Sequence, residues 1–570
     1  MTKTREVSFV QVRKAATVYM ALPLFCFLGG FLRWYYAIIS CAVLGFLLWL
    51  VSQSRNREAG CNGQSTISIQ TIAWVFVFSM LWSYFGGMNG YFYQSTDWNC
   101  RNAIYFDLIH YRWPVVYDLS GQALVYYIGH WLPPAALAKA VQHLSGSVEW
   151  GRSAGRMLLW LWSSLGLTII ILMVFSLVGA CTRKKRIAAT LILAFFSGLD
   201  VVGAILLRRI QFLLSPEIIH LEWWCSGYQF SSITTCLFWV FNQTIIPWMI
   251  TICFLSERDP RNYIFYCVVC LLCGTLPCIG LVVLMVFKAA DYCLQEIRTK
   301  NARGIPRIVF SVQNLLAFFV VFPLVASFIL TSNIVGLPGV AAKSSTEQTA
   351  APPTDLRAFS ARDTTLQHLS VESFAEAAEE ENDEDTAAVL SLSAKLHIPE
   401  NLRPRLHALK RLALFLTFEV GLYLLCIFPD HYKNLMYYVL CLSFLLIPDI
   451  HVGYSTDFCM RASVPGVFIL MLYVNRFLLA HFPTGKAERH GVPAGEGGRR
   501  AAAVVLAICF MLGTATPIVE FSRGIYHVAK SGTLFLEDRS LMTFNREEGT
   551  GDNFACSHPE DYFFFKYLAG

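Results

Sequence analysis

Charged residues are scarce in this chain. Its 570 residues are 15% charged and 55% hydrophobic, whereas about a quarter of the residues of an ordinary soluble domain are charged. This composition excludes a soluble enzyme, because the apolar residues lie in runs of about 20, the length that crosses a bilayer as a helix. The net charge of +6 comes from short basic clusters between these runs. Since no basic stripe follows one helix face, nucleic acid is excluded as a partner.

The familiar nucleotide and hydrolase motifs are missing as well. The sequence contains no GxxxxGK[ST], no GxGxxG between a strand and a helix, no HExxH and no GxSxG, the motifs of phosphate loops, dinucleotide sites, zinc proteases and serine hydrolases. No internal repeat is visible, which argues against an inverted-repeat transporter. Most of the 18 cysteines lie inside apolar runs, where they behave as small hydrophobes. A bridge among the loop cysteines stays open.

What the chain has in abundance is long apolar runs, which predict an all-α polytopic membrane protein. The first run follows a basic N-terminus like a signal peptide, but a second run follows at once without a clear cleavage site, so we expect a retained span. We predict about thirteen transmembrane helices, near residues 15–32, 34–51, 67–86, 157–180, 187–206, 233–255, 262–275, 279–294, 308–332, 409–428, 434–449, 463–482 and 501–520.

Basic clusters give the orientation, because they favour the cytoplasmic side of a membrane. Thirteen spans place on one side the clusters Lys3 to Lys14, Arg55/Arg57, Arg183 to Arg186, Arg258/Arg261, Arg298 to Arg307 and Lys486 to Arg500. We therefore expect a multi-pass protein of the cell membrane, with a cytoplasmic N-terminus and an extracytoplasmic C-terminus. The agreement requires 262–294 to be a hairpin bent at Leu276-Pro277, since proline favours a break.

The same spans divide the chain into four regions. Residues 1–335 form an N-terminal transmembrane region with a large outer loop at 87–156, and residues 406–520 form a C-terminal one. Between them, residues 336–405 are an acidic, low-complexity insert outside the membrane, whose composition indicates a solvated and partly disordered segment. Residues 521–570 are an extracytoplasmic C-terminal segment that we expect to cap the outer face.

Ionisable residues near a membrane are candidate functional residues, and the first group lies early in the large outer loop. Asp97, Arg101, Asn102 and Asp107 occur on a stretch with the period of an amphipathic helix, which Pro114 ends. Asp97 is either an N-cap that pairs with Arg101 or a general base at the mouth of a membrane cavity. We predict that an interfacial helix pair follows at 123–130 and 134–144.

Three further groups fall at the outer ends of other spans. Each group has a structural interpretation, which is a helix end, an interfacial aromatic belt or an internal ion pair. Each also has a functional interpretation, in which its side chains form part of the wall of a substrate site. Arg461 in particular would offer a fixed positive charge to a lipid phosphate. The candidate substrate-binding residues in these groups are Asp200, His220, Glu222, Trp223, Tyr228, Asn242, Gln243, Asp457 and Arg461.

Carboxylates, arginine and aromatic residues at one membrane face suit the transfer of a sugar from a lipid-phosphate carrier. The lipid phosphate leaves readily once a cation offsets its charge, and one carboxylate suffices as the base for the acceptor hydroxyl. No nucleotide site is needed for this chemistry.

This layout resembles the membrane glycosyltransferases of the GT-C superfamily. The shared features are an N-inside chain, a large outer loop after an odd-numbered span, an early acid in that loop and two interfacial helices. Short stretches also resemble a bacterial group of GT-C-like proteins over roughly residues 1–335 and 406–520: STDWNCRNAIYFDLI, WLPPAALAK, FSGLD, HLEWW, LFWVFNQ and STDFCMRASVP. The resemblance implies that Asp97 is the catalytic base, that the donor is a polyprenyl-phosphate-linked sugar and that the acceptor is a glycan, a lipid or a protein.

Two departures from that pattern concern the cofactor and the N-terminus. Metal-dependent GT-C enzymes often carry two acids one residue apart in the loop, but here Trp98 and Asn99 follow Asp97. No cofactor is therefore assigned, and a divalent cation stays open. Two short spans also precede the third, an added N-terminal hairpin relative to the usual layout.

Two other functions stay open on the sequence. A polymerase or ligase of lipid-linked glycans would also carry arginines in its outer loops. A transporter or flippase would place ionisable residues near the bilayer midplane in broken helices, for which Glu419 inside a predicted span and the Pro277 and Pro323 breaks are the only hints.

Overall fold

The computed structural model describes residues 6–53, 66–95, 97–209, 220–333, 403–452, 456–482, 496–531, 539–543 and 551–570. As predicted, these residues are mainly helical. Their strands are β1 (Glu6–Ser8), β2 (Thr66–Ser68), β3 (Ala123–Leu124) and β4 (Ala555–Cys556), and their helices are α1 (Phe9–Phe31), α2 (Trp34–Ser52), α3 (Ile69–Phe85), α4 (Asp97–His110), α5 (Leu132–Ser145), α6 (Val148–Val178), α7 (Arg183–Phe195), α8 (Asp200–Leu206), α10 (Ile233–Val240), α11 (Ile245–Ser256), α12 (Tyr263–Cys273), α13 (Thr275–Arg298), α14 (Ile305–Val309), α15 (Val312–Leu316), α16 (Phe322–Ile329), α19 (Arg403–Leu416), α20 (Leu422–His431), α21 (Leu435–Leu446), α22 (Asp457–Ala462), α23 (Val464–His481), α24 (Glu496–Gly513) and α25 (Ala515–Ser531).

The number of membrane spans is smaller than predicted. Within the described residues, eight helices are long and apolar enough to cross a bilayer, or up to ten if each of two bent helix pairs is one span. The prediction of thirteen is therefore wrong. Three predicted segments fall on shorter apolar helices, Ile69–Phe85, Tyr263–Cys273 and Leu435–Asp449. At 1.5 Å per residue these do not reach the roughly 30 Å of a hydrocarbon core.

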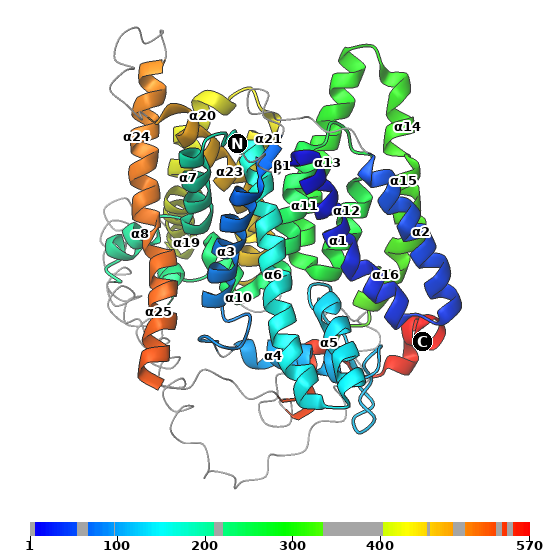
Figure 1. The fold of residues 1–570 in the computed structure, drawn as a ribbon. Coiled ribbons are helices and arrows are strands. Elements are labelled where there is room, and N and C mark those ends of the chain that lie inside the picture. Colours follow the sequence, from blue (N-terminus) through cyan, green and yellow to red (C-terminus); the bar gives the residue numbers. More distant parts are fainter. Residues whose placement is uncertain are drawn as a thin grey trace, which may run out of the picture.

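The bundle has two distinct ends (Figure 1). Helices α4 and α5 gather at one end with the C-terminal residues, and α6 runs from there to the opposite end. That opposite end carries the start of α7, the α13–α14 junction and the start of α24, so the basic clusters at these three places share one end of the bundle, as predicted. We refer to the α4–α5 end as the outer end. That it faces away from the cytoplasm stays a prediction.

One predicted feature of the chain path is confirmed, and another is corrected. Helices α12 and α13 form the expected hairpin, broken at Gly274, with Cys278 Sγ 3.4 Å from the carbonyl oxygen of Cys267. The predicted helix at 123–130 is wrong, because Ala123 and Leu124 form a strand that pairs with Cys556 and Ala555. Pairing over more than 400 residues leaves no local signal in the sequence.

The C-terminal boundaries also differ from the prediction. Helices α24 and α25 together make one apolar stretch, Gly497–Lys530, so the predicted span 501–520 ends too early and the boundary at 520/521 falls inside α25. The acidic insert 336–405 lies outside the described residues, apart from the first residues of α19. The cysteines that the structure describes are all free thiols.

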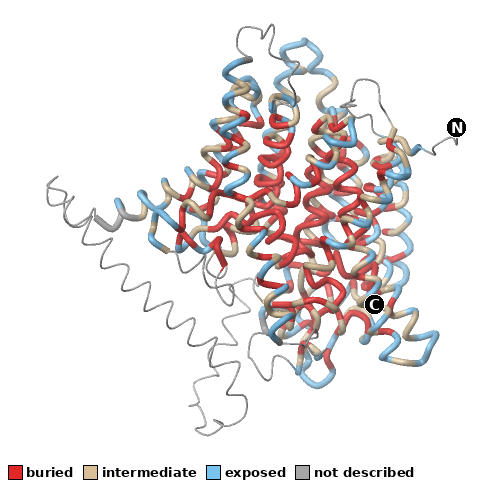
Figure 2. Tube along the Cα trace, turned by 60° about the vertical axis from the view of Figure 1, so that its left-hand side comes forward, coloured by how far each residue is buried: buried red, intermediate tan, exposed pale blue. Residues whose placement is uncertain are grey.

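Burial follows the pattern expected of a bundle in lipid. Buried residues fill the centre of the bundle and exposed residues line its outside (Figure 2). On α2 the exposed side chains are themselves large and apolar, including Ile38, Ile39 and Trp49. Such an apolar outer face is stable in a bilayer and costly in water. The polar residues of the centre therefore need internal partners.

Candidate functional site

The first charge pair of the candidate site lies at the start of α4. Asp97 is the first residue of this helix, and Arg101 is one turn further along, so that Arg101 Nη2 donates to Asp97 Oδ2 at 3.0 Å. The Asp97 side chain is 52% exposed. The Arg101 guanidinium lies over the Trp98 ring, 5.9 Å from its centroid. Its Nη1 atom is buried without a hydrogen-bond partner in the described part of the chain.

The second charge pair comes from a segment 360 residues further along the chain. Asp457 and Arg461 are one turn apart on α22, with Oδ1 and Nη2 at 3.1 Å. Burial raises the pKa of Asp457, while the Arg461 charge opposes this shift. The side chains of Asp97 and Arg101 lie close enough to act on Asp457 as well. We call Asp97–Arg101 and Asp457–Arg461 the mouth pairs.

Asn242 and Gln243 reach the same neighbourhood from a third segment. They lie in a 3-10 turn at a 101° bend between α10 and α11, and Gln243 Nε2 is 3.5 Å from the hydroxyl oxygen of Tyr126. The Tyr126 phenol in turn interacts with the charges of Arg461 and Arg101. Both amide atoms of Asn242 and Oε1 of Gln243 are buried without a partner among the described residues.

A hollow of about 300 Å³ opens beside the first mouth pair. We call it the tryptophan hollow, because Trp98 and Trp239 form part of its wall, together with Tyr93, Ser95, Glu520 and Arg523. Aromatic faces next to charged and hydroxyl groups can stack on a sugar ring and hydrogen-bond its hydroxyls. Glu520 and Arg523 come from α25, which the sequence analysis did not include in the site.

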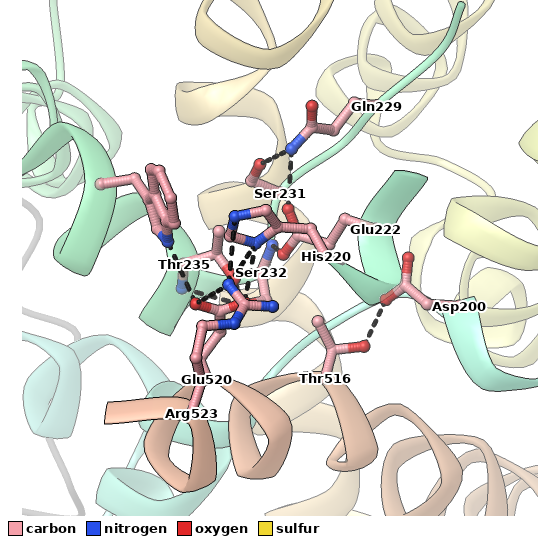
Figure 3. Close-up of polar contacts among 11 residues, drawn as sticks. Asp200, His220, Glu222, Gln229, Ser231, Ser232, Thr235, Thr516, Glu520 and Arg523 are labelled. Carbon is pink, nitrogen blue, oxygen red and sulfur yellow. Dashed lines mark hydrogen bonds and ion pairs between the residues drawn. The ribbon is translucent and has the colours of Figure 1, made fainter. Parts of the chain in front are cut away.

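His220, Glu520 and Arg523 form a buried triad (Figure 3). His220 Nδ1 lies 2.9 Å from Glu520 Oε1, and Arg523 Nη1 lies 3.1 Å from the same oxygen. The other Glu520 oxygen accepts from Trp239 Nε1 at 3.0 Å. Burial lowers the pKa of His220, although the Glu520 charge opposes the shift. Because the carboxylate has partners on both oxygens, the triad compensates its own charges.

Asp200 and Glu222 lie close to this triad, but each has its own hydrogen-bond partners (Figure 3). Asp200 Oδ2 accepts from Thr516 on α25 at 2.6 Å and from Ser197 at 2.9 Å. The two oxygens of Glu222 accept from the Ser232 backbone N–H and from Gln229 Nε2. Burial raises the pKa of Glu222, and the nearby charge of Asp200 raises it further.

Gln229 also connects Glu222 to the second mouth pair. Its Oε1 accepts from the hydroxyl of Thr456, the residue before Asp457. Glu419, in a π-helical turn of the span Ala408–His431, reaches this neighbourhood from another side and accepts from Trp224 Nε1 at 2.8 Å. Four predicted groups far apart in sequence are thus brought together.

Four predicted site residues are placed elsewhere or only at the edge. Asp107 is buried and accepts from the Tyr117 hydroxyl, Ser540 Oγ and the Leu541 N–H, so it fastens the C-terminal segment to α4. Tyr228 packs on Phe415, 5.4 Å between ring centroids. Trp223 is 43% exposed beside His220. Asn102 donates to Gln94 and lines a different hollow, described below.

The sequence analysis missed Glu520, Arg523, Thr516, Trp239 and Tyr126. A weak signal was present for the two charged residues, since an acid and a base three apart close to an apolar run are neighbours on a helix face. A boundary drawn at 520 hid this signal, because it assigned Arg523 to a cap outside the membrane. Nothing local marks Trp239 or Tyr126.

Neither a metal site nor a family is identified. Among the described residues, no three His, Cys, Asp or Glu side chains are grouped so that they could hold a metal ion. No known protein family, no curated protein and no solved structure matches this chain. The chain is shown to be a polytopic all-helical membrane protein, and its resemblance to GT-C enzymes carries no further support from these comparisons.

Proposed function

We propose that this chain is a membrane glycosyltransferase of the GT-C type. It would transfer a sugar from a polyprenyl-phosphate donor to a hydroxyl of a glycan, lipid or protein acceptor at the extracytoplasmic face. The observation that carries the proposal is the set of buried polar atoms around the mouth pairs that have no hydrogen-bond partner among the described residues. Arg101 Nη1, Arg461 Nε and the Asn242 amide come from three distant segments. Buried polar atoms normally find a partner, so this set suits a polar, anionic ligand.

The proposed reaction uses the mouth pairs as base and cation. The Asp97 carboxylate takes the proton of the acceptor hydroxyl, and the acceptor oxygen forms a bond to the anomeric carbon of the donor sugar. The bond between that carbon and the phosphate oxygen breaks, and the lipid phosphate leaves with the electron pair. Arg461, supported by Arg101, stabilises the charge that develops on it. Pairing with Arg101 orients the base.

The tryptophan hollow supports a sugar as the transferred group. It lies directly beside Asp97, with Ser95 and Trp98 of the same segment in its wall. Trp98 stacks on Phe241 at 5.0 Å between centroids and is 2% exposed, so it supports the wall from within, whereas Tyr93 and Trp239 are the partly exposed aromatic rings of the wall. An aromatic face held by packing lowers the entropy cost of holding a sugar ring.

The test is the substitution Asp97→Asn in the full chain, reconstituted in lipid nanodiscs. The assay measures the release of polyprenyl phosphate from polyprenyl-phosphate-linked sugars, supplied together with membrane extract as the source of acceptor. Loss of a general base is expected to lower the rate about 10²- to 10⁴-fold. Since the Asp97 side chain is about half exposed, the melting temperature should change little.

Asp118→Asn is the matched control, because Asp118 is an exposed acid of the same outer loop. It should transfer sugar at the wild-type rate. A wild-type rate in Asp97→Asn, or unchanged glycan in cells that carry only this variant, would rule out Asp97 as the base. No release from any polyprenyl-phosphate sugar by the wild type would contradict the proposed function itself.

A second function, proton-coupled transport, is favoured by one specific observation. Asp200, Glu222 and Glu419 are three buried carboxyl groups that interact with one another, and Asp200 begins the second half of a helix pair bent by 42°. Buried acids at broken helices are typical of transporters. Sugar or lipid flux into liposomes that depends on a proton gradient, and that Glu419→Gln abolishes, would favour this function over transfer.

A further inference from the structure

A second hollow lies further along helix α4. It measures about 390 Å³ and is lined by Gln94, Asn102 and Phe106 and by Arg152 and Arg156 from the first turns of α6. We call it the arginine hollow. None of its lining residues is acidic, and the buried side chains of Met88 and Leu159 form an apolar part of its wall. It therefore joins two positive charges to an apolar wall, the combination that a lipid head group requires.

Tight packing fixes the positions of the two arginines. The carbonyl of Gly155, between them, accepts from the Tyr105 hydroxyl at 2.8 Å. A Cβ at Gly155 would lie 2.5 Å from Ile109 Cδ1, so α6 packs closely on α4 here and a larger residue would require the Ile109 side chain to shift. The Arg152 guanidinium lies over the Phe106 ring, 4.9 Å from its centroid. Ring and guanidinium are thus preorganised, which favours bidentate contacts with a phosphate.

The surroundings place the arginine hollow at the level of lipid head groups. Trp150, two residues before Arg152, is 67% exposed, and Leu144 at the end of α5 is 91% exposed. Tryptophan at the end of a membrane helix is typical of the interface between head groups and acyl chains. An exposed leucine beside it suits a helix that dips into this layer.

We propose that the arginine hollow binds the phosphate group of a membrane lipid. This site has its own lining residues and does not depend on the transferase proposal. Arg152 and Arg156 hold the phosphate oxygens, and Asn102 lies beside the head group.

The experiment uses the full chain in nanodiscs and a photoreactive phosphatidylglycerol as probe. Peptide mapping of the wild type should find the label within residues 88–109 and 148–160. Arg152→Gln and Arg156→Gln should each lower labelling about tenfold or more, because each removes charge-assisted hydrogen bonds to the phosphate. Arg112→Gln is the matched control, an exposed arginine beyond the end of α4, and it should label like the wild type.

Competition identifies the lipid. Stronger competition by polyprenyl phosphate than by unlabelled phosphatidylglycerol assigns the site to the carrier lipid, and the reverse assigns it to bulk anionic lipid; both support the proposal. Equal competition by diacylglycerol, or by inorganic phosphate at the same concentration, overturns it. The proposal is also overturned if the label is found only in other segments, or if both arginine variants label as strongly as the wild type. The same holds if Arg112→Gln loses as much labelling as Arg152→Gln and Arg156→Gln do. Asp97→Asn should keep full labelling, which separates this proposal from the transferase.

Discussion

The mouth pairs and the buried triad contain the same kinds of charged side chain, but they differ in burial and in hydrogen bonding. In the mouth pairs, Asp97 is half exposed, and Arg101 and Arg461 each keep a nitrogen atom that has no partner in the part of the chain that the structure describes. In the triad, Glu520 is 5% exposed and has partners on both oxygens. Glu520 and Arg523 also line the tryptophan hollow, so the contrast lies in the pairing of the charges. A carboxylate with partners on both oxygens holds helices together, whereas an arginine with a spare donor is able to bind a ligand. We therefore expect substitutions in the triad to affect folding first and substitutions in the mouth pairs to affect activity first.

The largest effect on stability is expected from Glu520→Gln. This change leaves Arg523 buried without its carboxylate, and breaking a buried pair costs about 3–5 kcal/mol. Thermal unfolding in detergent should show a clear loss of melting temperature, with Asp97→Asn as the comparison variant that changes little. If Glu520→Gln keeps the wild-type melting temperature but loses transfer, the triad belongs to the catalytic machinery and the contrast with the mouth pairs fails.

A smaller effect, on substrate binding, is expected from Arg461→Gln. Losing a cation for the donor phosphate should raise the KM for the polyprenyl-phosphate donor about 10- to 100-fold, with little change in melting temperature, because the pair with Asp457 is partly exposed. Arg461→Lys should recover part of the affinity, since it keeps the charge and loses the planar fork. An unchanged KM in Arg461→Gln would remove this residue from the donor site.

The smallest effect concerns the pH dependence of stability at Asp107, outside both groups. Burial raises its pKa to about 6, although hydrogen bonds from Tyr117, Leu541 and Ser540 oppose the shift. The native state then binds more protons than the unfolded state between about pH 4 and pH 6. The contribution of Asp107 to the free energy of unfolding should therefore fall as the pH rises through this range.

Asp107→Asn should remove this part of the pH dependence, because the amide does not titrate. The measurement is the melting temperature of wild type and variant from pH 4 to pH 7, taken as a difference to cancel other titrating groups. Parallel curves would contradict a raised pKa at Asp107.

Sequence reasoning reached the membrane class, the α12–α13 hairpin and most residues around the mouth, but it placed the break at Leu276-Pro277, whereas the structure has it at Gly274. Local spacing was enough for the Asp97–Arg101 and Asp457–Arg461 pairs, since four residues are one helical turn. It failed where distance along the chain matters. Asp107 was predicted to bind substrate, but its carboxylate accepts a hydrogen bond from the Leu541 N–H. Residues 123–130 were predicted to be helical, but Ala123 and Leu124 pair with β4.

The sequence by itself determined that this chain lives in a bilayer and which ionisable residues gather at span ends, because these depend on composition and on the short periods of a helix. Only the tertiary structure decided how many helices are long enough to span, where the break between α12 and α13 falls, that α25 brings Glu520 and Arg523 to His220, and that α4 contributes to two hollows. Those outcomes depend on packing between segments hundreds of residues apart, for which no local pattern exists.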